Sequence, residues 1–168
     1  MSHNSAALVT VSIGSNINRE FYIRESVVAL REQFGDLSVS PVYETAAVGF
    51  DGEDFLNLVV SFVTEIDVYQ VSVLLKGIED KLGRDRSQPR FSARCIDLDL
   101  LTYADLILDD SRIQIPRHEI LENAFVLKPL SDLEADREHP QLGVSYQKLW
   151  DEMRVSAGRI EKIEMDLN

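Results

Sequence analysis

The 168-residue sequence has a single cysteine, Cys95, no long hydrophobic run and no basic N-terminal region. One cysteine excludes an internal disulfide bond and is typical of a reducing compartment. Residues 1–7 are polar and no stretch is apolar enough to span a bilayer, so neither a signal peptide nor a transmembrane helix is indicated. We therefore expect a cytoplasmic protein.

Internal repeats, linkers and low-complexity segments are absent as well. A chain of 168 residues with 45% hydrophobic and 27% charged residues is typical of one globular domain that buries its own core. We expect a single domain spanning residues 1–168, in which residues 1–7 and roughly 155–168 are flexible tails.

Positive charge is scarce, with 17 lysines and arginines against 29 acidic residues and a formal net charge of −12. This balance argues against binding to nucleic acid or to an anionic membrane. We expect small-molecule partners and a monomer, with a dimer as the alternative. Residues 84–94 are the exception, because their four arginines and one aspartate make a locally cationic segment that can capture an anion.

Two acidic residues, Asp97 and Asp99, lie inside an apolar run that is typical of a strand. Side chains alternate along a strand, so both carboxylates project from one face, about 6.6 Å apart along the backbone. Their repulsion and desolvation cost stability, and a divalent metal ion offsets both. Carboxylates for Mg²⁺ beside arginines for phosphate oxygens indicate phosphoryl transfer. The alternative is a solvated acidic strand end beside an ordinary surface loop.

Hydrophobic periodicity predicts strands and helices in the order β-α-β-β-α-β. A strand over 8–13 ends at a turn cluster, Gly14-Ser15-Asn16, and is followed by a helix that Asn18 caps and Gly35 ends. A strand over 37–43 carries Pro41, which favours an edge or a bulge. The remaining predictions are an apolar strand over 55–66, a helix from Asp67 to Gly83, the Asp97/Asp99 strand, a hairpin around 109–111, a helical stretch over 118–133 interrupted at Pro129, and a helix followed by a strand after Ser145.

This order predicts the α+β fold class. We expect a ferredoxin-like βαββαβ antiparallel sheet with helices packed on it, plus a C-terminal elaboration.

Five segments, in order and with family-like spacing, resemble the 6-hydroxymethyl-7,8-dihydropterin pyrophosphokinase family of folate biosynthesis. The segments are Ile13-Gly14-Ser15-Asn16, Tyr43-Glu44-Thr45 through Phe55-Leu56-Asn57, Glu79 with Gly83-Arg84, Arg94 through Asp99, and Ala124 through Leu130. The resemblance implies transfer of the β,γ-pyrophosphate of ATP to the pterin hydroxymethyl group, with release of AMP.

The resemblance also implies roles for individual residues. Asp97 and Asp99 would hold two Mg²⁺ ions that bridge the triphosphate of ATP and the incoming hydroxyl. Arg84 and Arg94 would neutralise phosphate oxygens, since the guanidinium stays charged and binds two oxygens at once. By the same positional match, Arg86, Phe91, Arg112 and His118 are expected nucleotide contacts, although His118 is equally well explained as a surface residue at a helix start.

The implied pterin pocket contains a polar edge and two aromatic faces. Phe55 and Phe125 would hold the flat bicycle between them, and Asn57 offers a donor and an acceptor together. The full set of expected pterin contacts is Thr45, Ala46, Val48, Phe55, Asn57 and Phe125. No general base is assigned: Glu79 and Lys76, one helical turn apart, either orient the site or form an ordinary surface pair.

Several positions depart from the usual family pattern. Phe91-Ser92-Ala93 stands where most members have Trp-Gly-Pro, and Ala46-Ala47 replaces a common Pro-Pro. Pro116-Arg117 replaces a common Pro-His, and Asn123 a frequent arginine. The alternatives are therefore a non-catalytic pterin- or nucleotide-binding paralogue and a pyrophosphokinase acting on a modified pterin. A Mg²⁺-dependent glycosyltransferase, which shares the Asp-x-Asp motif, ranks last because such enzymes normally need a larger domain.

Overall fold

A computed structural model describes residues 5–46, 53–83 and 95–167. The elements are β1 (Ala7–Ser15), α1 (Arg19–Phe34), β2 (Ser38–Val39), β3 (Val42–Thr45), β4 (Phe55–Thr64), α2 (Val68–Lys81), β5 (Asp97–Tyr103), β6 (Leu108–Asp109), β7 (Gln114–Ile115), α3 (Glu119–Glu122), α4 (Ala124–Leu133), α5 (Tyr146–Met153) and β8 (Glu161–Ile163). No helix among these described residues is long and apolar enough to cross a membrane.

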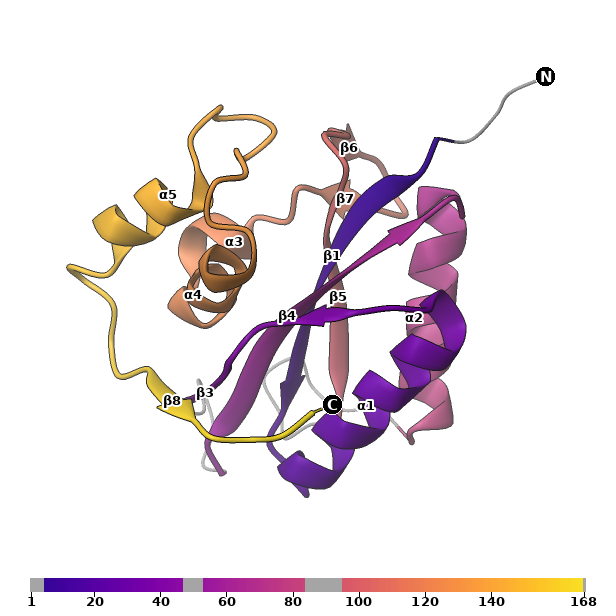
Figure 1. Ribbon diagram of the computed structural model, residues 1–168, viewed down its shortest axis with the longest axis horizontal. Helices are drawn as coiled ribbons and strands as arrows, with labels where there is room; N and C mark the ends of the chain where they lie inside the picture. The colour runs from indigo at the N-terminus through magenta and orange to yellow at the C-terminus, as the bar shows by residue number, and fades with distance from the viewer. Residues whose placement is uncertain (1–4, 47–52, 84–94, 168) are drawn as a thin grey trace.

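One antiparallel sheet organises the molecule, with strands in the order β5-β1-β4-β3-β8 and β2 paired to β4. Figure 1 shows α1 and α2 on one side of this sheet and α3, α4 and α5 on the other. The predicted mixture of an antiparallel sheet and packed helices is confirmed. The predicted hairpin around 109–111 is confirmed too, as the antiparallel pair β6 and β7.

Each face of the sheet carries its own hydrophobic cluster, and the alternation along β4 explains why. Leu56, Leu58 and Val60 belong to the cluster under α1 and α2, whereas Val59 packs with α3, α4 and α5. A strand that is buried on both faces is almost continuously apolar, as the sequence of this strand predicts. The same alternation along β5 turns Leu98 and Leu100 toward α1 and α2, so Asp97, Asp99 and Leu101 face the α4 side.

The predicted helix of residues 67–83 is confirmed as α2, and its cap has the expected chemistry. Asp67 Oδ1 accepts hydrogen bonds from the backbone N–H of Tyr69 (3.0 Å) and Gln70 (3.2 Å). Asn18 precedes α1 as predicted, but its backbone is left-handed with a φ of 43° and its side chain makes no capping bond. Gly35 ends α1 with a φ of 84°, where a glycine meets no Cβ penalty.

Three sequence-based boundaries are wrong. Gly14 and Ser15 do not form a turn, because β1 continues through both, paired with β4 as far as Ser15 and with β5 as far as Gly14. Pro129 does not interrupt the third helical stretch: it lies inside α4, and the break falls at Asn123, whose extended backbone separates α3 from α4. The strand predicted over 37–43 is split in two, with Pro41 in the gap between β2 and β3.

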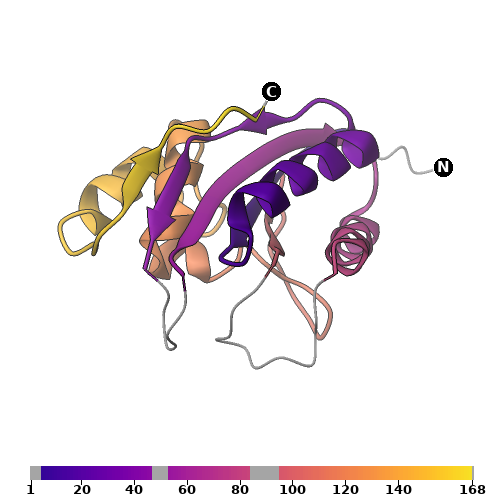
Figure 2. The ribbon, with the colours of Figure 1, turned by 90° about the horizontal axis from the view of Figure 1, so that it is seen from below.

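The C-terminal residues return to the sheet. The predicted helix and strand after Ser145 are confirmed as α5 and β8, and β8 pairs antiparallel with β3 from Val42↔Ile163 to Glu44↔Glu161. Figure 2 shows β8 beside β3 at the outer edge of the sheet. Arg31 on α1 donates a hydrogen bond of 2.6 Å to the carbonyl of Leu167. Residues 155–167, which we expect from sequence to form a flexible tail, therefore carry a strand and specific contacts.

Candidate active site

Strand pairing aligns four residues across the sheet. Gly14 on β1 pairs with Asp97 on β5 and with Asn57 on β4, and Asn57 pairs in turn with Tyr43 on β3. Directly paired residues project from the same face of a sheet, here the face on the α4 side. Because neighbouring strands lie about 4.8 Å apart, the backbones of Asp97 and Asn57 are roughly 10 Å apart, with Gly14 between them. One face therefore presents a carboxylate and an amide on either side of a residue without a side chain.

Gly14 keeps the space between them open. A Cβ atom at this position would lie 3.2 Å from Asn57 Oδ1 and 3.8 Å from Phe55 Cδ1. The first distance is tighter than an ordinary van der Waals contact, so the amide group would have to move to accommodate a side chain. The sequence alone does not indicate Gly14 as a site residue, since a Gly-Ser-Asn run at the end of a strand is more typical of a turn.

Asp97 and Asp99 share this face, as predicted, and both are half-buried. Burial, and then the Asp97 carboxylate, raise the pKa of Asp99 to about 7, which the Arg117 guanidinium partly opposes. Arg117 Nη2 lies 4.0 Å from Asp99 Oδ1. Burial thus disfavours the charged form of Asp99, the Asp97 carboxylate adds to this effect, and a divalent cation bound by the pair would offset both.

The carboxylate pair fits Mg²⁺ better than metals that favour histidine or cysteine. Among the residues that the structure describes, no group of three or more His, Cys, Asp or Glu side chains gathers to form a metal site. Mg²⁺ is typically held by one or two carboxylates, with substrate phosphates and water as the remaining ligands. Asp97 and Asp99 could therefore hold it together with a bound nucleotide.

Arg117 is a second residue whose place the sequence alone did not reveal. Its Nε and Nη2 atoms donate to the two carboxylate oxygens of Glu119, at 3.1 and 2.9 Å, so the guanidinium is held in a fixed orientation. Its backbone N–H donates to the carbonyl of Leu101 on β5. The structure thus fixes a cation beside the carboxylate pair.

Glu79 supports the carboxylate strand from α2. Its side chain is buried, and Oε2 accepts a hydrogen bond of 2.8 Å from the backbone N–H of Leu98, the residue between Asp97 and Asp99. The interpretation of Glu79 as part of an ordinary surface pair is therefore wrong, since a surface carboxylate would not be 3% exposed. Glu79 instead ties α2 to the outer edge of β5.

The structure brings together three of the expected pterin contacts. Asn57 Nδ2 donates a hydrogen bond of 2.8 Å to Thr45 Oγ1, and both residues are buried. Thr45 pairs directly with Phe55, which is half-buried. Phe125 lies on α4, the helix that packs on this face of the sheet, and is also half-buried. Ala46 follows β3 and is exposed.

Other predicted contacts lie elsewhere or are not described. Arg112 is exposed on the β6–β7 turn, where its guanidinium stacks over the ring of Tyr69 at 3.8 Å from the centroid. His118 is exposed at the start of α3 and its side chain makes no capping bond. Neither is brought next to the carboxylates by the contacts described. Val48, Arg84, Arg86, Phe91 and Arg94 lie outside the described residues.

A mixed α/β fold whose antiparallel sheet carries a carboxylate pair, and across Gly14 a buried amide, has the side chains that a phosphotransferase needs for a metal ion and an acceptor. The model of the 7,8-dihydro-6-hydroxymethylpterin-pyrophosphokinase (HPPK) family matches residues 10–135. The chain belongs to this family, whose members act as pyrophosphokinases in folate biosynthesis. Family membership does not favour the alternative of a non-catalytic paralogue.

Individual relatives agree with the family match. The chain is 33% identical over 127 residues to the 2-amino-4-hydroxy-6-hydroxymethyldihydropteridine pyrophosphokinase of Bacillus subtilis, covering 73% of this chain and 75% of that protein. It is 29% identical over 136 residues to the Aquifex aeolicus enzyme of the same name, covering 80% and 84%. It is 35% identical over 140 residues to the folic acid synthesis protein fol1 of Pneumocystis carinii, covering 82% of this chain and 19% of that protein.

A solved structure shares the fold. The wild-type Plasmodium falciparum HPPK-DHPS with pteroate superposes with a TM-score of 0.69 at 16% identity, covering 93% of this chain and 44% of that one. The chain thus spans less than half of this protein and about a fifth of the fungal one.

Proposed function

We propose that this chain transfers the terminal pyrophosphate of ATP to the hydroxymethyl group of 6-hydroxymethyl-7,8-dihydropterin and releases AMP, in a Mg²⁺-dependent reaction. The observation that supports it best is the row of paired residues that puts Asp97 and Asn57 on either side of Gly14. A metal-bound triphosphate at Asp97 and a pterin at Asn57 would bind on the same face of the sheet, on either side of β1. Holding two reactants in this way supplies much of the catalysis in phosphoryl transfer.

At the metal end, Asp97 and Asp99 would hold two Mg²⁺ ions. Such ions offset the charge on the phosphate oxygens and orient the incoming hydroxyl. Arg84 and Arg94 would neutralise the charge that develops as the bond to AMP breaks. The catalytic set is thus Arg84, Arg94, Asp97 and Asp99, and no protein base is assigned.

At the pterin end, Thr45 and Asn57 form a polar edge that is already fixed by their mutual hydrogen bond. The Asn57 amide matches the donor and acceptor pattern of the pterin ring, and Phe55 and Phe125 provide aromatic faces. Ala46 and Val48 complete the proposed pocket. For the nucleotide we retain Arg86, Phe91, Arg112 and His118 on the family resemblance alone.

We further propose that residues 1–168 act as one cytoplasmic, monomeric domain without nucleic-acid or membrane partners. Two hydrophobic clusters that share one sheet support a single domain, and the net charge of −12 opposes polyanion binding. The strand order β5-β1-β4-β3 with α1 and α2 on one face supports the ferredoxin-like description of the core, with α3 to β8 as the C-terminal elaboration.

Product analysis tests the reaction directly. The protein is incubated with ATP, Mg²⁺ and 6-hydroxymethyl-7,8-dihydropterin, and nucleotides are separated, with a reaction that lacks pterin as the control. AMP formed only when pterin is present is the expected result. ADP in place of AMP would mean transfer of a single phosphate, and AMP formation independent of pterin would indicate another acceptor.

A further inference from the structure

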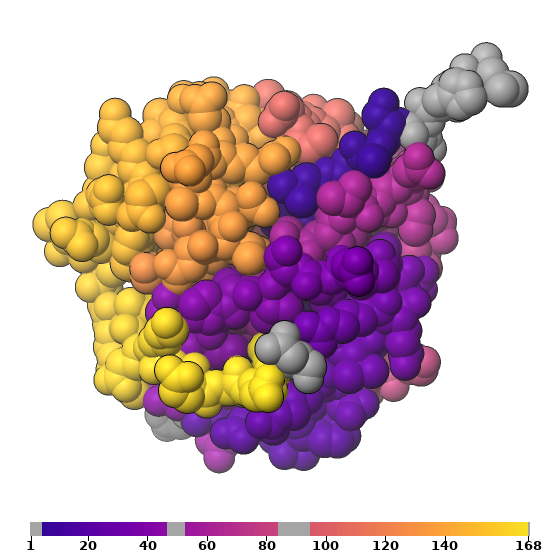
Figure 3. Space-filling view, in the orientation of Figure 1, coloured from indigo at the N-terminus to yellow at the C-terminus, as the bar shows by residue number. Residues whose placement is uncertain are grey.

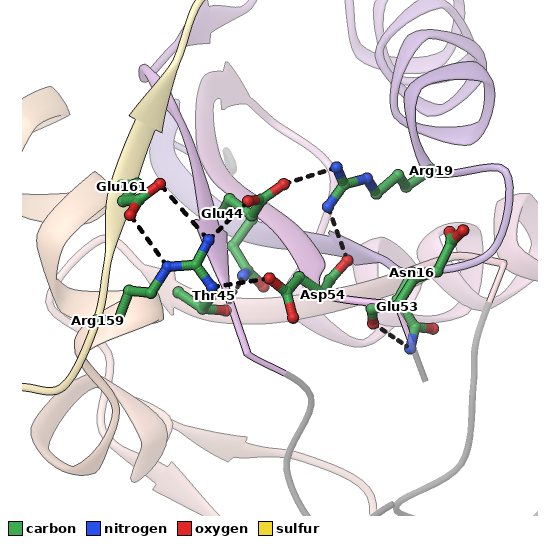
Figure 4. Close-up of polar contacts among 9 residues, drawn as sticks. Asn16, Arg19, Glu44, Thr45, Glu53, Asp54, Arg159 and Glu161 are labelled. Carbon is green, nitrogen blue, oxygen red and sulfur yellow. Dashed lines mark hydrogen bonds and ion pairs between the residues drawn. The ribbon is translucent and has the colours of Figure 1, made fainter. Parts of the chain in front are cut away.

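An arginine near the C-terminus connects the end of β3 to the residue that precedes β4. Arg159 Nη2 lies 2.9 Å from Glu44 Oε1, and its Nη1 lies 2.9 Å from Asp54 Oδ2. Its Nε donates at 3.0 Å to Glu161, which begins β8. Figure 4 shows this one guanidinium between side chains from three segments. Arg159 therefore bridges residues that are 105 and 115 positions away in sequence.

The two main partners of Arg159 border the proposed pterin pocket. Glu44 precedes Thr45, and Asp54 precedes Phe55, and Thr45 and Phe55 are directly paired. Glu44 itself faces away from the pocket, because side chains alternate along β3 and Thr45 lies on the Asn57 side. Arg159 can thus affect the pocket only through the backbone of β3 and β4, not by touching the pterin.

Arg19 holds the same two residues from α1. Its Nη2 lies 2.6 Å from Glu44 Oε2, and its Nη1 donates at 2.9 Å to the backbone carbonyl of Asp54. The two oxygens of Glu44 are therefore each occupied by a different arginine, and the Glu44 side chain is only 17% exposed. Isolated surface ion pairs contribute little to stability. In a network, each side chain is already held by several partners, so each further contact costs less conformational entropy.

The rest of the C-terminal segment is positioned to keep Arg159 in place. β8 pairs with β3 immediately beside Glu44, and Arg31 holds the carbonyl of Leu167. In Figure 3 the C-terminal residues lie on the surface next to β3 and α1. Residues well beyond the family match, which ends at 135, thereby contact the strand that carries Thr45.

We propose that Arg159 is a positioning residue for the pterin end of the site, which sets the spacing of Thr45 and Phe55 by bridging Glu44 and Asp54. This proposal rests on the proposed function for the identity of the ligand. It assigns to the C-terminal segment a role in pterin affinity, and none in holding the nucleotide or the metal.

The test compares Arg159→Gln and Arg159→Lys with a matched control, Arg154→Gln. Arg154 is exposed on the same segment and has no ion pair to a described residue. The dissociation constant of 6-hydroxymethyl-7,8-dihydropterin is measured by fluorescence with Mg²⁺ and a non-hydrolysable ATP analogue, and KM and kcat for both substrates are measured by AMP formation.

We expect Arg159→Gln to weaken pterin binding about fivefold and to raise KM for pterin, with KM for ATP and kcat nearly unchanged. Arg159→Lys retains the positive charge but not the several N–H donors of the guanidinium, so its pterin affinity should lie between those of Arg159→Gln and the wild type. The pterin affinity of Arg154→Gln should match that of the wild type. Equal effects on pterin and ATP, or an unchanged pterin dissociation constant, would overturn the proposal. If the wild type binds pterin but forms no AMP, the proposed reaction fails, while the binding constants still decide the role of Arg159.

Discussion

At the scale of single residues, the candidate site combines two carboxylates on β5 with a glycine on β1 that leaves space beside them. The alternation of a strand is enough to place Asp97 and Asp99 on one face. Gly14 could not be recognised in the same way, because its importance depends on which residues β1 pairs with on both sides. Pairing between distant strands is a property of the folded chain and leaves no local pattern. The identity of Arg117 as a neighbour of Asp99 depends on tertiary structure for the same reason.

Replacing Gly14 should disturb the pterin end selectively. In Gly14→Ala the new methyl group would approach Asn57 Oδ1 to 3.2 Å, so we expect the amide to shift and pterin affinity to fall several-fold. Gly77→Ala is the control, since Gly77 lies exposed in α2 with no atom within 4 Å of an added Cβ. That variant should leave pterin binding unchanged and stabilise α2 by about 0.5–1 kcal/mol. Equal pterin affinities in the two variants would contradict the role of Gly14.

Replacing either of the two proposed metal ligands, Asp97 or Asp99, should lower activity without lowering stability. We expect Asp97→Asn and Asp99→Asn to lower kcat by about 10²–10³-fold, because transition-state charge is no longer offset. The thermal midpoint should stay the same or rise, since each substitution removes repulsion between two half-buried carboxylates. Steady-state kinetics of the purified variants measure kcat. Thermal unfolding without added metal measures the midpoint. A rate near that of the wild type would exclude the metal assignment.

At the scale of elements, helix α2 and strand β5 are linked through one buried carboxylate. Glu79→Ala leaves the Leu98 N–H without its partner, which typically costs about 1–3 kcal/mol of unfolding free energy. Glu79→Gln keeps an acceptor oxygen at the same place and should be milder. Urea unfolding of both variants gives the comparison, and kcat should follow the same order because Leu98 lies between the two aspartates. A stability loss that is equal in both would show that the hydrogen bond to Leu98 is unimportant.

The segment between α4 and α5 should make stability depend on pH. Burial lowers the pKa of His139, and its Nδ1 accepts a hydrogen bond of 3.2 Å from the backbone N–H of Gln141. The unfolded chain takes up this proton near pH 6.5, whereas the folded chain does so only at a lower pH. The unfolded state therefore binds more protons below about pH 6.5, and unfolding free energy falls as the pH falls, by at most about 1.4 kcal/mol per pH unit.

His139→Asn, which keeps an acceptor, should lose this part of the pH dependence. Urea unfolding gives the free energy of unfolding at pH 7.5 and at pH 5.5. The difference between these two free energies should be smaller in the variant than in the wild type. An identical difference in both proteins would mean that His139 does not titrate with folding.

The sequence predicts the start of a helix correctly where a neighbouring side chain caps it. It predicts boundaries wrongly where contacts with distant parts of the chain determine them. Asp67 caps α2 through its own side chain, so the sequence was sufficient. Pro129 is tolerated inside α4, which packs between β4 and α5, and burial there outweighs the lost backbone hydrogen bond. The break at Asn123 has no comparable signal in the sequence.

At the scale of the whole molecule, the order of strands in one sheet brings the residues of the candidate site together. β5 brings the carboxylates, β1 the glycine, β4 the amide, and β3 the threonine, and β8 closes the outer edge. The β-α-β-β-α-β pattern was readable from periodicity, as was a strand near the C-terminus. The pairing of this C-terminal strand with β3 could not be predicted from the sequence, because the paired residues are more than a hundred positions apart.

The most direct test of whether the metal and pterin ends share one face is the effect of Mn²⁺, a paramagnetic substitute for Mg²⁺, on the side-chain amide signals of the protein. With an ATP analogue bound, we expect Mn²⁺ to broaden the Asn57 amide strongly, since the two ends lie roughly 10 Å apart across Gly14. The Gln147 amide on α5, paired with Asp151, should be broadened far less, and Asp97→Asn should abolish the effect at Asn57. A sharp Asn57 signal in the wild type, or equal broadening of Asn57 and Gln147, would contradict the arrangement on which the proposed transfer depends.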